Sequence, residues 1–87
     1  MDTETQRIFE VIKSNLLSVV VDLNPDEVTI EKSMTELGAN SVDRVEVVMY
    51  STEALGLKIS PAELHGASNL AGLVEILKRH AASGKTG

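Results

Sequence analysis

The chain has 87 residues, which is enough for one compact domain and too few for two. Its formal net charge of -5 disfavours nucleic acid as a partner, because binding a phosphate backbone depends on clustered Lys and Arg. With one Phe, one Tyr, no Trp and no Cys, the sequence offers little aromatic surface and no disulfide, and it predicts a core of aliphatic side chains.

The amino-terminal residues 1–6 are acidic and polar, whereas a secretory signal would start with basic residues and continue into an apolar run. No apolar stretch approaches the roughly 20 residues that a membrane span requires. These features predict a cytoplasmic protein with no membrane segment.

The first helix is expected to begin at Thr3, because Thr3 and Gln6 have the spacing of a capping box. Asn24 and Pro25 should end it, since the residue before a proline avoids the helical conformation. Between them, apolar residues recur at steps of three and four, as on one face of an amphipathic helix. These residues are Ile8, Ile12, Leu16, Val19 and Leu23.

A long irregular segment follows, from Asn24 to Asn40, and connections of this length in small domains are usually functional. Its isolated apolar residues, which should pin it to the core, are Val28, Ile30, Met34 and Leu37. The second helix is predicted over 41–55, where Gly56 stops it. Its predicted buried face consists of Val45, Val48 and Leu55, with Val47 at the edge and with Val42 and Met49 exposed.

Two further helices complete the prediction. The run Ser60–Glu63 joins a cap serine, a proline at the first helical position and a glutamate at the capping-box position, which predicts a short helix ending near Gly66. The last helix should start at Ser68 or Asn69 and bury Leu70, Leu73, Val74 and Leu77. We therefore expect an all-α four-helix bundle over residues 1–82, with a short third helix and a long first loop. The last helix should fray from Ala81, with a flexible tail at 83–87.

The segment Leu37–Asp43 is the candidate functional site. In it, a loop that contains a glycine places Ser41 in the first turn of a helix. Capping alone would explain a serine at this place. A helix N-terminus also favours an anion, so a phosphodiester on Ser41 would be stabilised there. The two histidines, His65 and His80, lie in other segments and leave the serine without an activating base. They also lack metal-ligand spacing, so no metal site is predicted.

At these residues the chain resembles the acyl carrier protein family, from Glu36–Asp43 through Val45–Met49 to Ile59. In that family the serine at this place carries a 4'-phosphopantetheine group, whose thiol holds an acyl chain as a thioester. The resemblance implies that a phosphopantetheinyl transferase modifies Ser41, and that the protein carries acyl, malonyl or acetyl groups and catalyses nothing itself.

Two residues depart from the family's usual Asp-Ser-Leu. Asn40 lacks the carboxylate that helps engage the transferase, and Val42 is smaller than the usual leucine. Peptidyl carriers typically have a histidine before the serine, so Asn40 also argues against that subclass. The second helix is the family's recognition helix, and the resemblance implies partner contacts through Asn40, Val42, Asp43, Arg44, Glu46 and Met49.

Arg44 and the valine-rich second helix look more like polyketide carriers than like the fatty-acid carrier. Within that group the chain looks like donor carriers that work beside an HMG-synthase-like enzyme in β-branching, with a ketosynthase or acyltransferase as further partners. The alternatives are a fatty-acid carrier and a helical interaction module that lost the cofactor. A hydrolase using Ser41 lacks a neighbouring base. The carrier role predicts a monomer, because the second helix must stay open to many partners.

Overall fold

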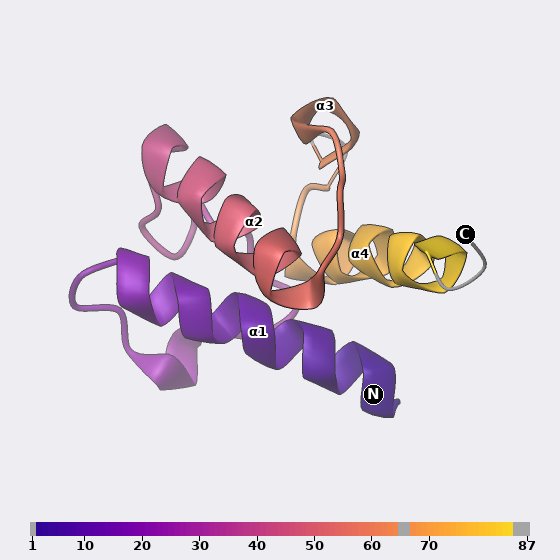
Figure 1. The fold of residues 1–87 in the computed structure, drawn as a ribbon. Coiled ribbons are helices and arrows are strands. Elements are labelled where there is room, and N and C mark those ends of the chain that lie inside the picture. Colours follow the sequence, from indigo (N-terminus) through magenta and orange to yellow (C-terminus); the bar gives the residue numbers. More distant parts are fainter. Residues whose placement is uncertain (1, 65–66, 85–87) are drawn as a thin grey trace.

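The computed structural model describes residues 2–64 and 67–84 (Figure 1). These residues form four α-helices and one 3-10 turn, and they contain no strand. The elements are α1 (Thr3–Val19), η1 (Pro25–Glu27), α2 (Ser41–Leu55), α3 (Pro61–Leu64) and α4 (Leu70–Gly84). The predicted all-α architecture, with its short third helix and long first loop, is confirmed. None of the described helices is long and apolar enough to cross a bilayer.

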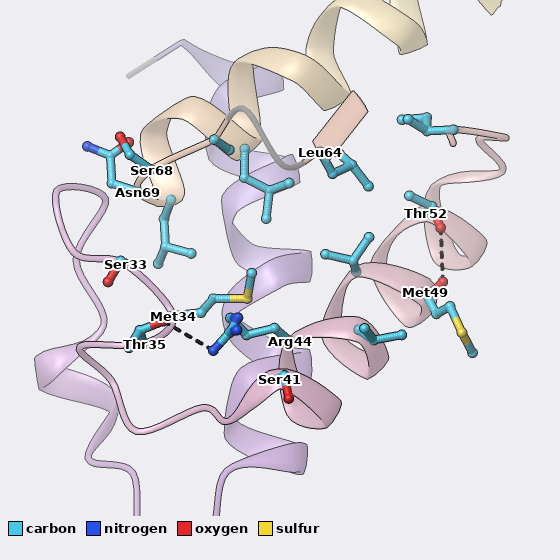
Figure 2. A pocket seen from close by; sticks show the side chains of 16 residues that line it. Ser33, Met34, Thr35, Ser41, Arg44, Met49, Thr52, Leu64, Ser68 and Asn69 are labelled. Carbon is cyan, nitrogen blue, oxygen red and sulfur yellow. Dashed lines mark hydrogen bonds between the residues drawn. The ribbon is translucent and has the colours of Figure 1, made fainter. Parts of the chain in front are cut away.

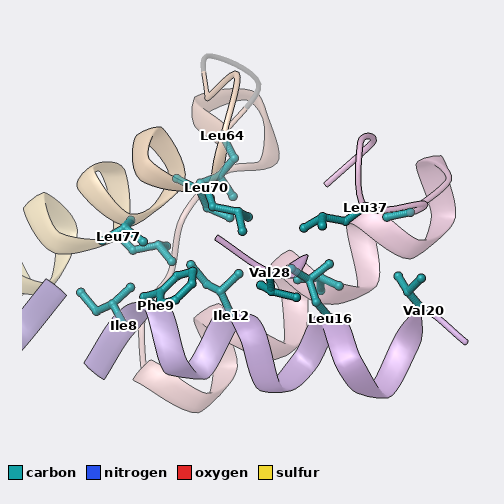
Figure 3. Packing of buried hydrophobic residues seen from close by; sticks show 14 residues of the cluster. Ile8, Phe9, Ile12, Leu16, Val20, Val28, Leu37, Leu64, Leu70 and Leu77 are labelled. Atoms are coloured by element: carbon teal, nitrogen blue, oxygen red, sulfur yellow. The ribbon is translucent and has the colours of Figure 1, made fainter. Parts of the chain in front are cut away.

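Helix α1 is the centre of the bundle and packs against both α2 and α4. Ile8, Ile12 and Leu16 are fully buried on its apolar face, as the periodicity predicts. Figure 3 shows these side chains meeting Leu70 and Leu77 from the α4 side. The rest of the buried cluster consists of Phe9, Val20, Val28, Leu37, Ala39, Val47, Leu64, Leu73 and Val74. The core is aliphatic apart from one phenylalanine.

Helix α1 begins at Thr3 as predicted, but its cap and its end differ from those predicted. The N-cap is Asp2, whose carboxylate accepts a hydrogen bond from the Thr5 amide at 2.7 Å, so the predicted Thr3–Gln6 capping box is wrong. The helix also ends at Val19, four residues before Leu23. Three consecutive β-branched residues, 19–21, weaken the helix there, and Val20 adopts an extended conformation in which its side chain remains in the core.

The long loop between α1 and α2 is tied to the start of α4 through its backbone. The Leu70 amide donates to the Lys32 carbonyl at 2.9 Å, and the Ala71 amide donates to the Ile30 carbonyl at 2.8 Å. These bonds satisfy two of the amides that a helix start leaves without intrahelical partners. The predicted apolar anchors hold the loop from the other side: Val28 and Leu37 are buried, and Ile30 and Met34 pack against the core.

The buried face of α2 is rotated from the predicted one. Val47 is fully buried, whereas Val45 is 59% exposed, so both assignments were wrong. Ser51, one turn after Val47, is also fully buried, and it accepts a hydrogen bond from Asn15 Nδ2 of α1 at 3.0 Å. A small side chain at position 51 lets α1 approach, and this approach turns Val47 inward. The predicted exposure of Val42 and Met49 is confirmed.

Helix α4 begins where the sequence predicts and ends later. Asn69 caps it by accepting a hydrogen bond from the Gly72 amide at 2.9 Å. Its helical backbone continues to Gly84, and the fraying from Ala81 stays a prediction. Residues 85–87 lie outside the described residues, and the flexibility of the tail stays a prediction. The predicted end of the third helix near Gly66 also falls partly outside them, and α3 is described as Pro61–Leu64.

Candidate functional site

The first turn of α2 is fixed by a reciprocal capping box between Asn40 and Asp43. The Asp43 amide donates to Asn40 Oδ1 at 2.8 Å, and the Asn40 amide donates to Asp43 Oδ2 at 3.2 Å. The sequence alone allowed Ser41 to be the cap, but Asn40 takes that position because it is the residue in extended conformation. Ser41 is therefore the first helical residue, and its hydroxyl is not used for capping.

The loop before Ser41 is anchored on both sides of Gly38. Leu37 and Ala39 are buried, and the Ala39 amide donates to the Met34 carbonyl at 3.0 Å. Gly38 has a φ of +94°, a conformation that side chains rarely adopt, and this lets the chain turn tightly between its two anchors. The position of Ser41 is thus set by the core on one side and by the capping box on the other.

The Ser41 side chain is exposed, as chemical modification of its hydroxyl requires. Within the described residues, the amides of Ser41 and Val42 have no hydrogen-bond partner. Together with the dipole of α2, these amides favour an anion beside the hydroxyl. The donor set suits a phosphodiester, which has no need of a metal or a base at this site.

A cavity of about 450 Å³ opens beside Ser41, between α2, the loop at 33–35 and the described residues 59, 64, 67–70 and 73 (Figure 2). Helices α2 and α4 both pack on α1, and the cavity is lined by α2 on one side and by the start of α4 on the other. Its lining residues are Ser33, Met34, Thr35, Ser41, Arg44, Val45, Val48, Met49, Thr52, Ile59, Leu64, Ala67, Ser68, Asn69, Leu70 and Leu73. Most of these side chains are apolar, so the cavity suits an aliphatic group.

Arg44 turns toward the loop rather than into solvent. Its Nη1 donates to Thr35 Oγ1 and to the Ala39 carbonyl, both at 3.2 Å, and the side chain is half-buried. The sequence suggested that Arg44 would present its charge to partners. The structure instead brings it together with Thr35 and Ala39, two residues that sequence reasoning did not single out.

The other predicted recognition residues divide into two groups. Val42 and Met49 are exposed, at 64% and 52%. Asp43 and Glu46 are half-buried and already bonded: Asp43 belongs to the capping box, and Glu46 accepts a weak hydrogen bond from Tyr50 at 3.4 Å. These bonds hold both carboxylates close to α2.

Helix α2 carries an exposed apolar stripe, and sequence reasoning missed one of its members. Val45 joins Val42 and Met49 on one side of α2, because the three follow the i, i+3, i+7 spacing of a helix face. That spacing is visible in the sequence and could have identified the stripe. Tyr50, 42% exposed, lies beside it.

The histidines stand apart from this site. His80 Nε2 lies 3.3 Å from Glu63 Oε1, an ion-pair geometry that joins α4 to α3. His65 is outside the described residues. The described part of the chain brings no base into hydrogen-bonding distance of the Ser41 hydroxyl.

Comparison with known proteins identifies the class. A family model described as a phosphopantetheine attachment site matches residues 14–77, which include α2 and the cavity. The chain belongs to this family: it is an acyl carrier protein, a carrier and not a catalyst, with 4'-phosphopantetheine bound covalently on a serine.

Two relatives illustrate the likeness. The chain is 42% identical to the polyketide biosynthesis acyl-carrier-protein AcpK of Bacillus subtilis, over 85% of this chain and 90% of the relative. It is 30% identical to an acyl carrier protein of Clostridium perfringens, over 84% of this chain and 96% of the relative. No solved structure gives a significant match.

Proposed function

We propose that Ser41 is the serine that carries the phosphopantetheine arm. The observation that supports this most is its position, as the exposed first residue of α2 at the rim of an apolar cavity. Two other serines in the family match are less suited. Ser51 is fully buried, and Ser33 accepts a hydrogen bond from the Glu36 amide at 3.0 Å.

The residues around Ser41 fit the arm. When bound, the arm supplies a thiol that holds acyl groups as thioesters. The amides of Ser41 and Val42 and the dipole of α2 stabilise its phosphodiester. The capping box holds the first turn of α2 in place, so the arm's root has a fixed position. Because the arm tethers its cargo, the cargo reaches each partner at high effective concentration.

Intact-mass analysis tests the attachment site. The chain is coexpressed with a broad-specificity phosphopantetheinyl transferase, as wild type and as the variants Ser41→Ala, Ser33→Ala and Ser68→Ala. The last two are matched controls, because both serines line the same cavity. We expect one phosphopantetheine addition in the wild type and in both controls, and none in Ser41→Ala. An addition that survives Ser41→Ala would overturn the assignment.

We further propose that the carrier works in polyketide biosynthesis as a cytoplasmic monomer, and that it delivers an acetyl group to an HMG-synthase-like enzyme in β-branching. Support comes from the higher identity to the relative named for polyketide biosynthesis, at 42%, than to the Clostridium perfringens carrier, at 30%. The presence of Arg44 among the acidic residues of α2 also favours it over a carrier that serves many basic partners.

The pathway is tested by partner choice. The acetyl-loaded protein is offered to an HMG-synthase-like enzyme of a β-branching cassette and, as the malonyl form, to a fatty-acid ketosynthase. We expect efficient turnover by the first enzyme. Equal turnover by the ketosynthase would favour the alternative, a fatty-acid carrier. Size-exclusion chromatography with light scattering checks the monomer.

A further inference from the structure

Arg44 differs from the rest of the cavity wall. Among the described lining residues, it alone has a charged side chain. It follows Ser41 by three residues in α2, so the two side chains lie on the same face of the helix. In Figure 2 the guanidinium lies between Ser41 and the apolar part of the cavity and points to Thr35 across the opening.

Two hydrogen bonds hold the guanidinium in this position. Arg44 Nη1 donates to Thr35 Oγ1 and to the Ala39 carbonyl at 3.2 Å, which connects α2 to the loop across the Ser41 end of the cavity. An arginine remains charged at any physiological pH, and its guanidinium cannot lose a proton to suit an apolar neighbour.

An alkyl chain on the thiol of the arm that enters the cavity from the Ser41 end therefore meets a charge there. To reach the apolar side chains of Val48, Leu70 and Leu73, it has to break these hydrogen bonds or remove water from the guanidinium. Both changes are unfavourable. An acetyl or malonyl group gains little from the cavity because it has few methylene groups to bury.

We infer that Arg44 is a specificity-determining residue that opposes insertion of long aliphatic acyl chains and makes this a carrier for short acyl groups. The inference rests on the proposed attachment at Ser41 and gives a structural reason for the short cargo. Short cargo stays outside the cavity, where a partner enzyme reaches the thioester without first extracting it.

The test compares octanoyl with acetyl groups on the arm, by nuclear magnetic resonance of the methyl groups of Val48, Leu70 and Leu73. The variants are Arg44→Leu, Arg44→Gln and, as a control, Arg79→Leu, which changes an exposed arginine outside this cavity. In the wild type the octanoyl form should resemble the acetyl form. Arg44→Leu should raise the ratio of inserted to free octanoyl chain about tenfold, Arg44→Gln should raise it less, and Arg79→Leu should leave it unchanged.

A second measurement does not depend on Ser41. Free S-octanoyl-N-acetylcysteamine is titrated into the unmodified chain, and Arg44→Leu should bind it about tenfold more tightly than the wild type. Should Arg44→Leu fail to fold, Thr35→Val removes one acceptor, keeps the arginine, and should give a gain of about threefold.

The outcomes separate the two proposals. If mass analysis finds no arm on Ser41, the proposed attachment fails, and the titration still decides the role of Arg44. Equal insertion or equal affinity in the wild type and Arg44→Leu would overturn the inference, and so would an equal gain in Arg79→Leu.

Discussion

Replacing Val47 with alanine should destabilise the protein much more than the same change at Val45, two residues away in α2. Val47 is fully buried against α1, whereas Val45 is 59% exposed. The change removes two carbon groups, each worth about 0.8 kcal/mol on burial, and it leaves a cavity. We expect Val47→Ala to lower the free energy of unfolding by about 2 to 3 kcal/mol, and Val45→Ala to change it by less than about 0.5 kcal/mol.

The loss at Val47 is large for this chain, because 87 residues correspond to a total stability of about 4 to 13 kcal/mol. Urea unfolding followed by the helical circular dichroism signal measures both variants. The slope of the free energy against urea should be unchanged, so the difference appears in the midpoint. Equal losses in the two variants, or a greater loss in Val45→Ala, would refute the orientation of α2 described here.

Three further predictions concern the ends of the helices. Asn40→Ala should cost about 1 kcal/mol of unfolding free energy through loss of the capping box, whereas Asn40→Asp should keep it; equal losses in urea would contradict the capping geometry. The hydrogen bond from Lys78, at 2.6 Å, holds the pKa of Asp2 below its ordinary range, so the ionised carboxylate stabilises the fold above about pH 4. This contribution should be lost as the pH falls, because acidification protonates the carboxylate. The urea midpoint is therefore measured at neutral and at acidic pH for each variant. The difference between the two midpoints should be smaller in Asp2→Asn than in the exposed control Asp22→Asn. Finally, Asn69→Ala should cost about 1 kcal/mol and speed amide hydrogen exchange in the first turn of α4; unchanged exchange would contradict a capping role.

Local signals in the sequence predicted the helices well. Gly56 ends α2 in the left-handed conformation, Pro61 begins α3, and Asn69 caps α4. Each signal acts within one turn of the backbone, so the neighbouring residues are enough to predict where the helix begins or ends. The start of α2 beside Ser41 was predicted for the same reason, although the cap itself proved to be Asn40.

The predictions were wrong where the cap or the buried face depends on a residue far away in the sequence. Asp2 and Thr3 are both suitable helix caps, and Asp2 also pairs with Lys78 of α4, which lies 76 residues along the chain. In α2, Val45 and Val47 are equally apolar, and the hydrogen bond between Ser51 and Asn15 of α1 accompanies the burial of Val47. Neither pairing can be read from periodicity, because it depends on how the helices meet.

In the candidate site, too, the locally determined features were predicted and the features that depend on tertiary packing were not. The exposed serine at the start of a helix follows from the local pattern. The cavity beside it does not, because it depends on how α2, the loop at 33–35 and the start of α4 come together. The inward turn of Arg44 depends in turn on the path of the loop, which brings Thr35 and the Ala39 carbonyl within 3.2 Å of its Nη1.

The backbone bonds from Leu70 to Lys32 and from Ala71 to Ile30 have a consequence for how this protein tolerates change. Main-chain groups are the same in almost every amino acid, so substitutions at these four positions leave the bonds available. An insertion or deletion between residues 32 and 37 is different, because it shifts the register between this tie and the buried Leu37. Outside its apolar anchors and Gly38, the loop should therefore accept many sequences but only one length, and that length sets the distance between the cavity wall and Ser41.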